Sequence, residues 1–111
     1  MDYDLYSELQ TKTRQLEASI RELRKNGTAF ATAERDYKIL LRTECLKLRD
    51  QGMAITLIDR ICYGIPSVAE ARFKRDCAEV VYDANKDAIQ SIKLQMRLIE
   101  AQLEREWGKD V

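Results

Sequence analysis

The sequence predicts an all-α protein, a long antiparallel helical hairpin of coiled-coil type with a short helix inserted at its closed end. Apolar residues recur at alternating steps of three and four over two long stretches, as in coiled coils. Only one Pro and four Gly interrupt the 111 residues, and 34% of them are charged. This composition is typical of long helices with a narrow apolar seam. The length favours a single domain, residues 1–111.

The first stretch predicts one helix from about residue 3 to about residue 50. Its seam consists of the following residues: Tyr6, Leu9, Thr13, Leu16, Ile20, Leu23, Gly27, Phe30, Glu34, Tyr37, Leu41, Glu44 and Leu48. Gly27 leaves the continuity of this helix open, because glycine costs about 1 kcal/mol relative to alanine in a helix interior. Gly52 suits the left-handed position that commonly ends a helix.

A short helix is expected at about residues 57–63, opened by a capping box of Thr56 and Asp59. Pro66 follows it. Ser67 and Glu70 then form a clearer capping box, which predicts the start of the final helix. We expect that helix to run to about Trp107. Its seam is formed by Ala71, Ala78, Tyr82, Ile89, Ile92, Met96, Ile99 and Leu103.

Size matching between the two seams suggests a register for the hairpin, in which large residues meet small ones and polar residues meet each other. Two polar layers arise in this register, and such layers can fix the alignment of paired helices. The expected facing pairs include Leu16 with Leu103, Ile20 with Ile99, Tyr37 with Tyr82, Glu34 with Asn85 and Glu44 with Arg75.

The most distinctive segment is the apolar connection between the two long helices. In one interpretation Met53, Ile55, Tyr63 and Ile65 stay partly exposed and bind a partner, with Tyr63 as the anchor. In the other the connection is a local core, in which Ile58, Ile61 and Cys62 cover Leu40, Leu46, Cys45 and Phe73. The sequence leaves both interpretations open.

Nucleic-acid binding is an alternative function, because basic residues follow one stripe of the first helix. Arg35, Lys38 and Arg42, together with Arg72 and Lys74, would form the phosphate-binding face. The last helix carries an acidic stripe at similar height, formed by Asp76, Glu79, Asp83 and Asp87. We expect the two stripes to neutralise each other across the helix pair, and the formal net charge is zero.

The sequence offers no signature of an enzyme, so no catalytic residue, cofactor or metal ligand is predicted. It has no His, no glycine-rich phosphate loop, and no Ser or Cys beside an evident base. Cys45, Cys62 and Cys77 are widely spaced, and we expect three reduced thiols. The acidic start and the lack of a long apolar run favour a cytoplasmic protein without a membrane span.

Several segments, at residues 33–38, 46–53 with 56–58, 68–76 and 99–107, resemble a group of small uncharacterised helical proteins encoded in phages and prophages of Gram-positive bacteria. The resemblance covers most of the chain from about residue 26. It implies an accessory role near phage DNA replication or recombination, in the cytoplasm of a bacterial host cell. We therefore expect a non-enzymatic protein that contacts a phage or host protein. Direct nucleic-acid binding and a structural homo-oligomeric bundle are the alternatives.

Overall fold

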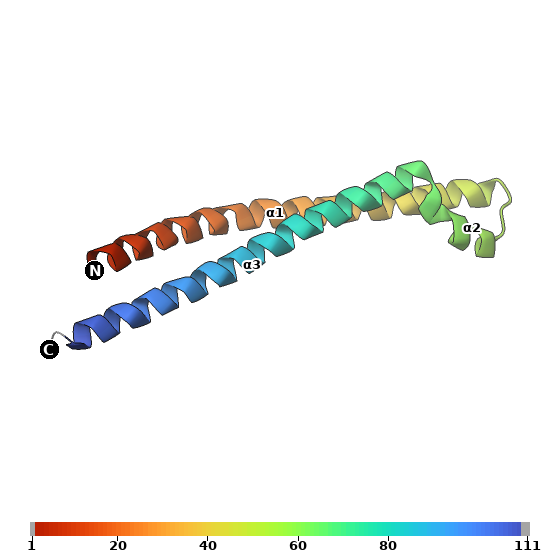
Figure 1. Ribbon diagram of the computed structural model, residues 1–111. Helices are drawn as coiled ribbons and strands as arrows, with labels where there is room; N and C mark the ends of the chain where they lie inside the picture. Colours follow the sequence, from red (N-terminus) through yellow and green to blue (C-terminus); the bar gives the residue numbers. More distant parts are fainter. Residues whose placement is uncertain (1, 110–111) are drawn as a thin grey trace. The chain divides into compact units, whose positions relative to one another are not determined.

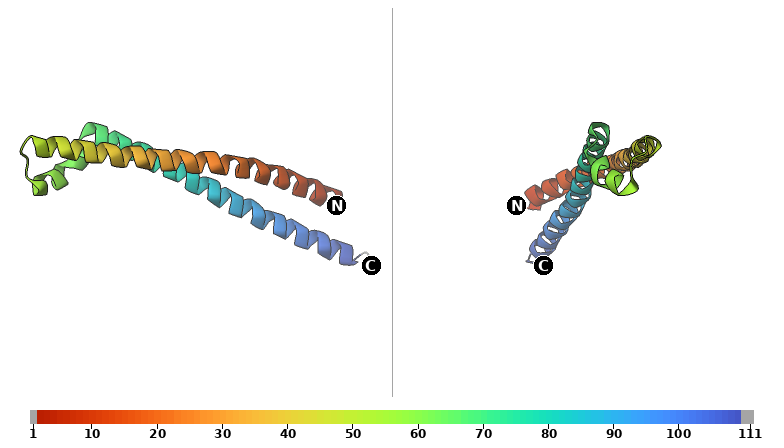
Figure 2. Two further views of the ribbon diagram at one scale, coloured as in Figure 1. Left: turned by 180° about the vertical axis from the view of Figure 1, so that it is seen from behind. Right: turned by 90° about the vertical axis from the view of Figure 1, so that its right-hand side faces the viewer.

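The computed structural model is an all-α helical hairpin, described here for residues 2–109 and for the side chains of residues 4–108 (Figure 1). Two long helices, α1 (Asp2–Asp50) and α3 (Pro66–Lys109), are joined through the short helix α2 (Ile55–Ile61) and the 3-10 turn η1 (Cys62–Gly64). The predicted fold class is thus confirmed. The connection between α1 and α2 is seen from two further directions in Figure 2.

Helix α1 is continuous through Gly27, which answers the question that the sequence left open. It ends in a Schellman motif. The N–H of Gly52 donates to the carbonyl of Arg49 at 2.9 Å, and the N–H of Met53 donates to that of Leu48 at 3.1 Å. Gly52 has φ 87°, the left-handed conformation that favours glycine. The predicted cap at Gly52 is therefore confirmed.

The two predicted capping boxes are wrong. Helix α2 begins at Ile55 after Ala54, which offers no side-chain cap, so Thr56 and Asp59 lie inside the helix. Helix α3 begins at Pro66, one residue before Ser67. Proline suits the first helical position because it has the required φ and lacks an N–H that would there be unpaired.

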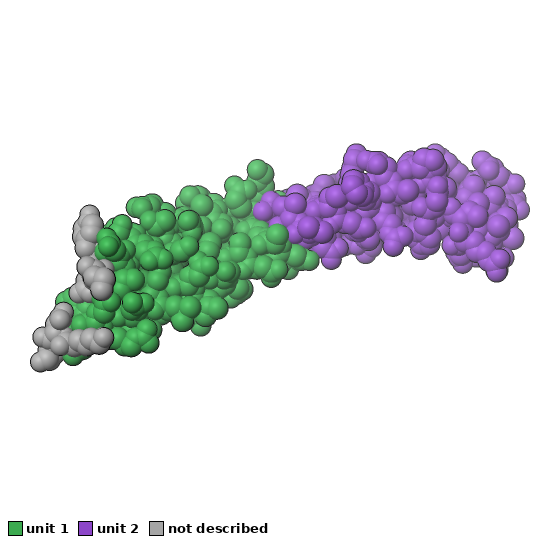
Figure 3. Space-filling view, viewed as in Figure 1, with its two compact units in different colours: residues 1–25, 83–111 green, residues 26–82 purple. Residues whose placement is uncertain are grey.

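The chain divides into two compact units, coloured separately in Figure 3. One comprises residues 1–25 and 83–111, and the other comprises residues 26–82. Each unit packs a segment of α1 against a segment of α3. The second unit also contains α2 and η1, and therefore the whole connection that the sequence singled out.

Most of the predicted seam residues face the partner helix within their unit. All eight predicted seam residues of α3 are buried or half-buried, and Ile89 and Ile99 are the two buried ones. On α1 the pattern holds at most positions, but Tyr6 and Ile20 are exposed. Leu5 and Ser19, one residue earlier in each case, are half-buried in their place. The periodicity thus located the two contact faces.

The predicted register is wrong, because the contacts between the helices pair residues of α1 with earlier parts of α3 than expected. Glu34 bonds Arg75 at 3.5 Å, whereas the sequence analysis paired Glu34 with Asn85. The Nδ2 of Asn85 instead donates to the carbonyl of Ser19 at 3.0 Å. Tyr82 does not face Tyr37.

The ring of Tyr82 lies 6.1 Å from that of Phe30 and covers the backbone at Gly27. A Cβ at position 27 would lie 3.1 Å from Cε1 of Tyr82. The missing side chain therefore makes room for an aromatic ring. This close approach gives Gly27 a packing role in the middle of a helix, where glycine is otherwise unfavourable.

Candidate partner-binding elbow

Residues 51–65, which we call the elbow, connect α1 to α3 within the unit of residues 26–82. The Schellman motif turns the chain at Gly52, and α2 then folds back beside the end of α1 (Figure 1). The N–H of Ile65 donates to the carbonyl of Cys62 at 3.3 Å and closes η1. Every turn of the elbow is thus held by backbone hydrogen bonds.

A narrow line of side chains fixes the elbow to the rest of its unit. Ile58 is 5% exposed and Cys62 is 3% exposed, one helical turn apart, and Val68 at the start of α3 is fully buried. The apolar residues that flank this line remain accessible. The local-core interpretation therefore holds for Ile58 and Cys62 but not for Ile61, Leu46 and Phe73, which are exposed.

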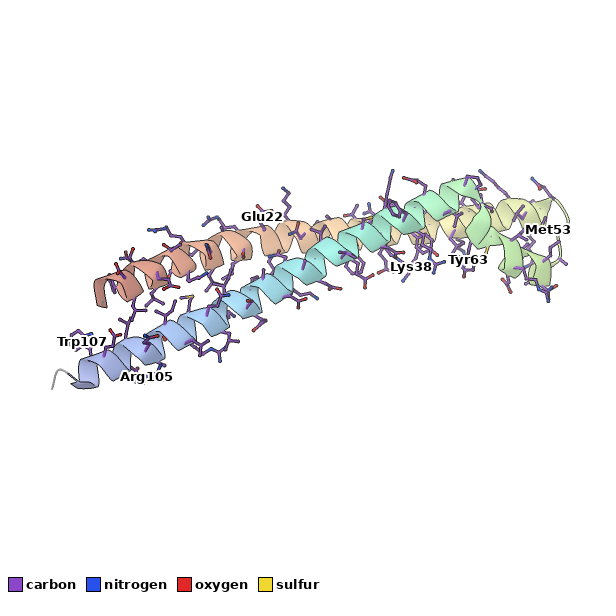
Figure 4. The ribbon with its side chains drawn as sticks, in the orientation of Figure 1. Glu22, Lys38, Met53, Tyr63, Arg105 and Trp107 are labelled. Carbon is purple, nitrogen blue, oxygen red and sulfur yellow. The ribbon has the colours of Figure 1, made fainter. Side chains whose placement is uncertain are left out.

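Two of the four predicted partner-binding residues are exposed and two are half-buried. Ile55 is 54% exposed and Tyr63 is 48% exposed, whereas Met53 and Ile65 are half-buried. Figure 4 labels Met53 at the turn and Tyr63 where the elbow approaches α3. The assignment of these four residues to a partner site remains a prediction.

Sequence reasoning missed Leu57 and Ile61, which are exposed on α2 and extend the apolar surface. They lie four residues apart and so share one side of the helix. Ile55 lies on the other side of the buried line. The available signal was the width of the apolar face of α2, because Ile55, Leu57, Ile58 and Ile61 span about 160° of its circumference and contact with one neighbour buries less than that.

A recess of about 220 Å³ lies between α2 and the last turns of α1. Its apolar wall is formed by Ile55, Ile58 and Leu46, and its positive charge comes from Arg42 and Arg49. Neither arginine forms an ion pair with any of the residues described. The carboxylate of Asp59 also lines the recess, so the lining carries one net positive charge at neutral pH.

Tyr63 is held in place by a basic side chain although it is half exposed. The guanidinium carbon of Arg72 lies 5.6 Å from the centroid of the Tyr63 ring, within the range of a cation–π contact. Arg72 was a candidate for phosphate binding. Its contact with Tyr63 gives it a local structural role that the sequence did not indicate.

The cysteines are free thiols with different surroundings: Cys62 is buried, Cys45 is half-buried and Cys77 is exposed. Burial is the main cause that raises the pKa of Cys45, and the neighbouring Cys62 and Asp59 raise it further. A thiol with a raised pKa is a weak nucleophile, because the thiolate is the reactive form. The environment of Cys45 is thus unlike that of a catalytic cysteine.

The expected neutralisation between the basic and acidic stripes is wrong for the pairs that form. Arg35 bonds Asp36 at 3.1 Å, and Lys38 bonds Glu34 at 3.7 Å, both within α1. On α3, Asp76 bonds Arg75 and Asp83 bonds Lys86. Two of these pairs join adjacent residues, and the other two join residues three or four positions apart on the same helix. The nucleic-acid face remains a prediction.

A second concavity, of about 680 Å³, lies between α1 and the first turns of α3 in the same unit. Its walls are mainly small residues, including Ala29, Ala33 and Ala71, with Asp36 and Lys74 at its edge. Small side chains on both helices leave this groove open. It carries no arrangement of polar groups that would favour a particular ligand.

Among the side chains described, no three His, Cys, Asp or Glu residues cluster in a way that could hold a metal ion. None of the described helices combines the length and the apolar character needed to cross a lipid bilayer. Comparison of the chain with protein families, with curated proteins and with solved structures gave no match.

Proposed function

We propose that this chain is a non-enzymatic interaction protein that binds a partner protein through its elbow. One observation carries the proposal: Ile55, Leu57, Ile61 and Tyr63 are all substantially exposed within nine residues of chain. Adjacent exposed apolar side chains commonly mark an interaction site. Two helices can be joined by a few polar residues, so an apolar connection fifteen residues long is more than a hairpin requires. A binding role explains the additional residues.

The recess beside α2 indicates what the partner presents. Its apolar wall suits an aliphatic or aromatic side chain, and Arg42 and Arg49 suit carboxylates next to it. The partner segment is therefore an apolar side chain flanked by acidic residues. In the phage or prophage setting that the sequence resemblance implies, this partner is a phage or host protein of DNA replication or recombination.

Site-specific photocrosslinking tests the elbow as the contact surface. A photoreactive amino acid replaces Tyr63 in one variant and the exposed Ile39 of α1 in a matched control. In cells that contain the natural partner, we expect the first variant to capture a defined protein and the control to capture none of it. Equal capture from both positions would contradict the proposal.

In purified variants, loss of partner binding and loss of fold stability should result from substitutions at different residues. Tyr63→Ala and Ile55→Ala should weaken binding to the captured protein by about 2 kcal/mol, or roughly 30-fold, while the melting temperature stays close to that of the wild type. Ile58→Ala should instead destabilise the fold by about 2 to 5 kcal/mol, because Ile58 is buried. A loss of stability in Tyr63→Ala as large as that in Ile58→Ala would show that the elbow is core.

A further inference from the structure

Two of the three cysteines meet where α2 packs beside the end of α1. Cys45 is half-buried on α1 and lines the recess together with Ile58 and Asp59 of α2. Cys62 is buried, and its N–H donates to the carbonyl of Ile58, so it follows Ile58 by one turn on the same side. The Sγ of Cys62 donates to the carbonyl of Asp59 at 3.9 Å. Both thiols thus adjoin the same turn of α2.

The two thiols also act on each other. Burial is the main cause that raises the pKa of Cys45, and Cys62 raises it next, through its charge and through a hydrogen bond between the side chains. These effects act at short range, so the two sulfur atoms are neighbours. Cys77 is exposed on α3 and is not among the groups that affect Cys45. The pair therefore consists of Cys45 and Cys62.

We propose that Cys45 and Cys62 are a redox pair whose disulfide fixes the elbow to the end of α1. The structure holds both residues as free thiols, which is the reduced state of the pair. In the oxidised state one covalent bond joins α1 to η1. It closes a loop of residues 46–61, which contains the turn at Gly52 and all of α2. The proposal concerns how the elbow is attached and does not depend on what the elbow binds.

The oxidant is a disulfide of low molecular weight, such as glutathione disulfide. The thiolate of Cys45 attacks one sulfur of this molecule, which forms a mixed disulfide at Cys45 and releases one small thiolate. The thiolate of Cys62 then attacks the Sγ of Cys45 and releases the second small thiolate. The two departing thiolates take up the two protons that the cysteines lose. Two protein thiols are thus oxidised to one disulfide, and the small disulfide is reduced to two thiols.

Access decides which cysteine reacts first. The recess of about 220 Å³ leads to Cys45, whereas Cys62 is only 3% exposed. A small disulfide therefore meets Cys45 first, and Cys62 acts as the second, resolving thiol. The raised pKa of Cys45 keeps its thiolate fraction small at neutral pH. The pair consequently responds to sustained oxidation more than to a brief exposure.

The disulfide acts on an element that is weakly attached. Helix α2 has seven residues, of which only Ile58 is buried. Segments with few buried contacts open locally at a small cost in free energy. The reduced elbow can therefore lift from α1 when it loses the contacts of Ile58 and Cys62. A bond from Cys62 to Cys45 prevents this opening.

Peptide mapping without reductant tests whether the bond forms. The full chain is incubated with excess glutathione disulfide, remaining thiols are blocked, and the chain is digested with trypsin. We expect residues 43–47 linked to residues 61–72, as a species that dithiothreitol separates. The exposed Cys77 should carry glutathione instead and serves as the control. Absence of the linked species, or linkage of Cys45 to Cys77 in its place, would overturn the proposal.

Single substitutions test the order of attack. In Cys62→Ala the resolving thiol is missing, so glutathione should accumulate on Cys45. Cys62→Ser, which keeps the size of the side chain, provides a second version of this variant. In Cys45→Ala the native chain should keep Cys62 as a thiol because Cys62 is buried. Circular dichroism verifies the helical content of each variant. If Cys62 takes up glutathione as fast as Cys77 in folded Cys45→Ala, Cys62 is not the resolving thiol.

Hydrogen exchange tests whether the bond holds α2 in place. The N–H groups of Ile58 and Cys62, which donate within α2 and at its end, should exchange at least about tenfold more slowly after oxidation. Dithiothreitol should restore the faster exchange. Residues 89–103 of α3 belong to the other unit, and their exchange should not change. Equal exchange of the α2 amides before and after oxidation would overturn the role of the disulfide as a lock.

Discussion

The guanidinium carbon of Arg75 lies 4.7 Å from the centroid of the Tyr37 ring, so a residue of α3 stacks on a buried aromatic residue of α1. The same guanidinium reaches Glu34 at 3.5 Å and Asp76 at 2.8 Å. The hydrogen bond to Asp76 is the main cause that raises the pKa of Arg75, although burial acts against it. Arg75 thereby ties one position of α3 to two positions of α1.

A double-mutant cycle measures the contact between Arg75 and Tyr37. Arg75→Met and Tyr37→Leu should show a coupling free energy of about 0.5 to 2 kcal/mol, as expected for a partly desolvated cation–π contact. Urea unfolding of the two single variants and the double variant gives this value. Tyr63 stacks on Arg72 rather than on Arg75, so a parallel cycle of Arg75→Met with Tyr63→Leu should be additive. Additivity in both cycles would mean that the stacking does not stabilise the fold.

Crosslinking provides a direct test of the register in the unit of residues 1–25 and 83–111. Leu16 lies along α1 between Lys12, which shares a recess with Gln95, and Ile20, which shares another with Ile89. Leu16 therefore faces a part of α3 near residues 92–96.

In a variant without the native cysteines, the pair Leu16→Cys and Met96→Cys should crosslink through a short bifunctional reagent. The pair Leu16→Cys and Leu103→Cys, which the sequence alone favoured, should not crosslink, because two helical turns separate Leu103 from Met96. Electrophoresis of the crosslinked chain distinguishes the two outcomes. Efficient crosslinking at Leu103 with none at Met96 would restore the register that the sequence suggested.

The sequence predicted the helices and their contact faces because both depend on local pattern. The end of α1 at Gly52 and the half-buried seam of α3 follow from glycine conformation and periodicity. The register of the two helices does not follow from this local pattern. Sliding one helix by ten residues, as from Asn85 to Arg75 opposite Glu34, brings another seam position to the partner, because ten residues are one heptad plus a three-residue step. The apolar pattern therefore fits several registers.

Specific side-chain contacts select among these registers, and a single sequence does not reveal them. In the observed register Arg75 stacks on Tyr37, and the ring of Tyr82 packs against the backbone of Gly27, which has no side chain. The elbow likewise has one feature that the sequence predicts and another that it does not. Its apolar character was evident from the sequence, but the exposure of Leu57 and Ile61 follows from the way α2 lies on α1, which only the three-dimensional structure gives.

The contact between Gly27 and Tyr82 predicts an unusual result for substitutions in the middle of a helix. Gly27→Leu should destabilise the protein by about 1 to 3 kcal/mol despite its better helix propensity, because the new side chain overlaps the Tyr82 ring. Gly108 lies in the last turn of α3 with open space around it, and Gly108→Leu should leave stability nearly unchanged. Thermal unfolding of the two variants makes the comparison. Stabilisation by Gly27→Leu would show that Tyr82 moves aside without cost.

The raised pKa of Cys45 predicts slow alkylation of this thiol. Its thiolate is disfavoured by burial, by Cys62 and by Asp59, so iodoacetamide should modify it more slowly than the exposed Cys77, which the reagent reaches directly. Mass spectrometry of peptides from the native chain follows both sites at once. Asp59→Asn should lower the pKa of Cys45 and speed its alkylation, because it removes a nearby negative charge. Asp50→Asn, at an exposed residue outside the causes of this shift, should have no effect.

The same pKa shift has a consequence for stability. A thiol whose pKa is higher in the folded state than its ordinary value of 9.0 favours folding below that value, where both states are protonated. Above pH 9.0 the unfolded chain loses this proton first, so the stability that Cys45 contributes falls until the folded thiol also ionises. The melting temperature of the wild type should therefore decrease more steeply above pH 9 than that of Cys45→Ser. Parallel decreases in the two proteins would mean that Cys45 has the same pKa in the folded and unfolded states.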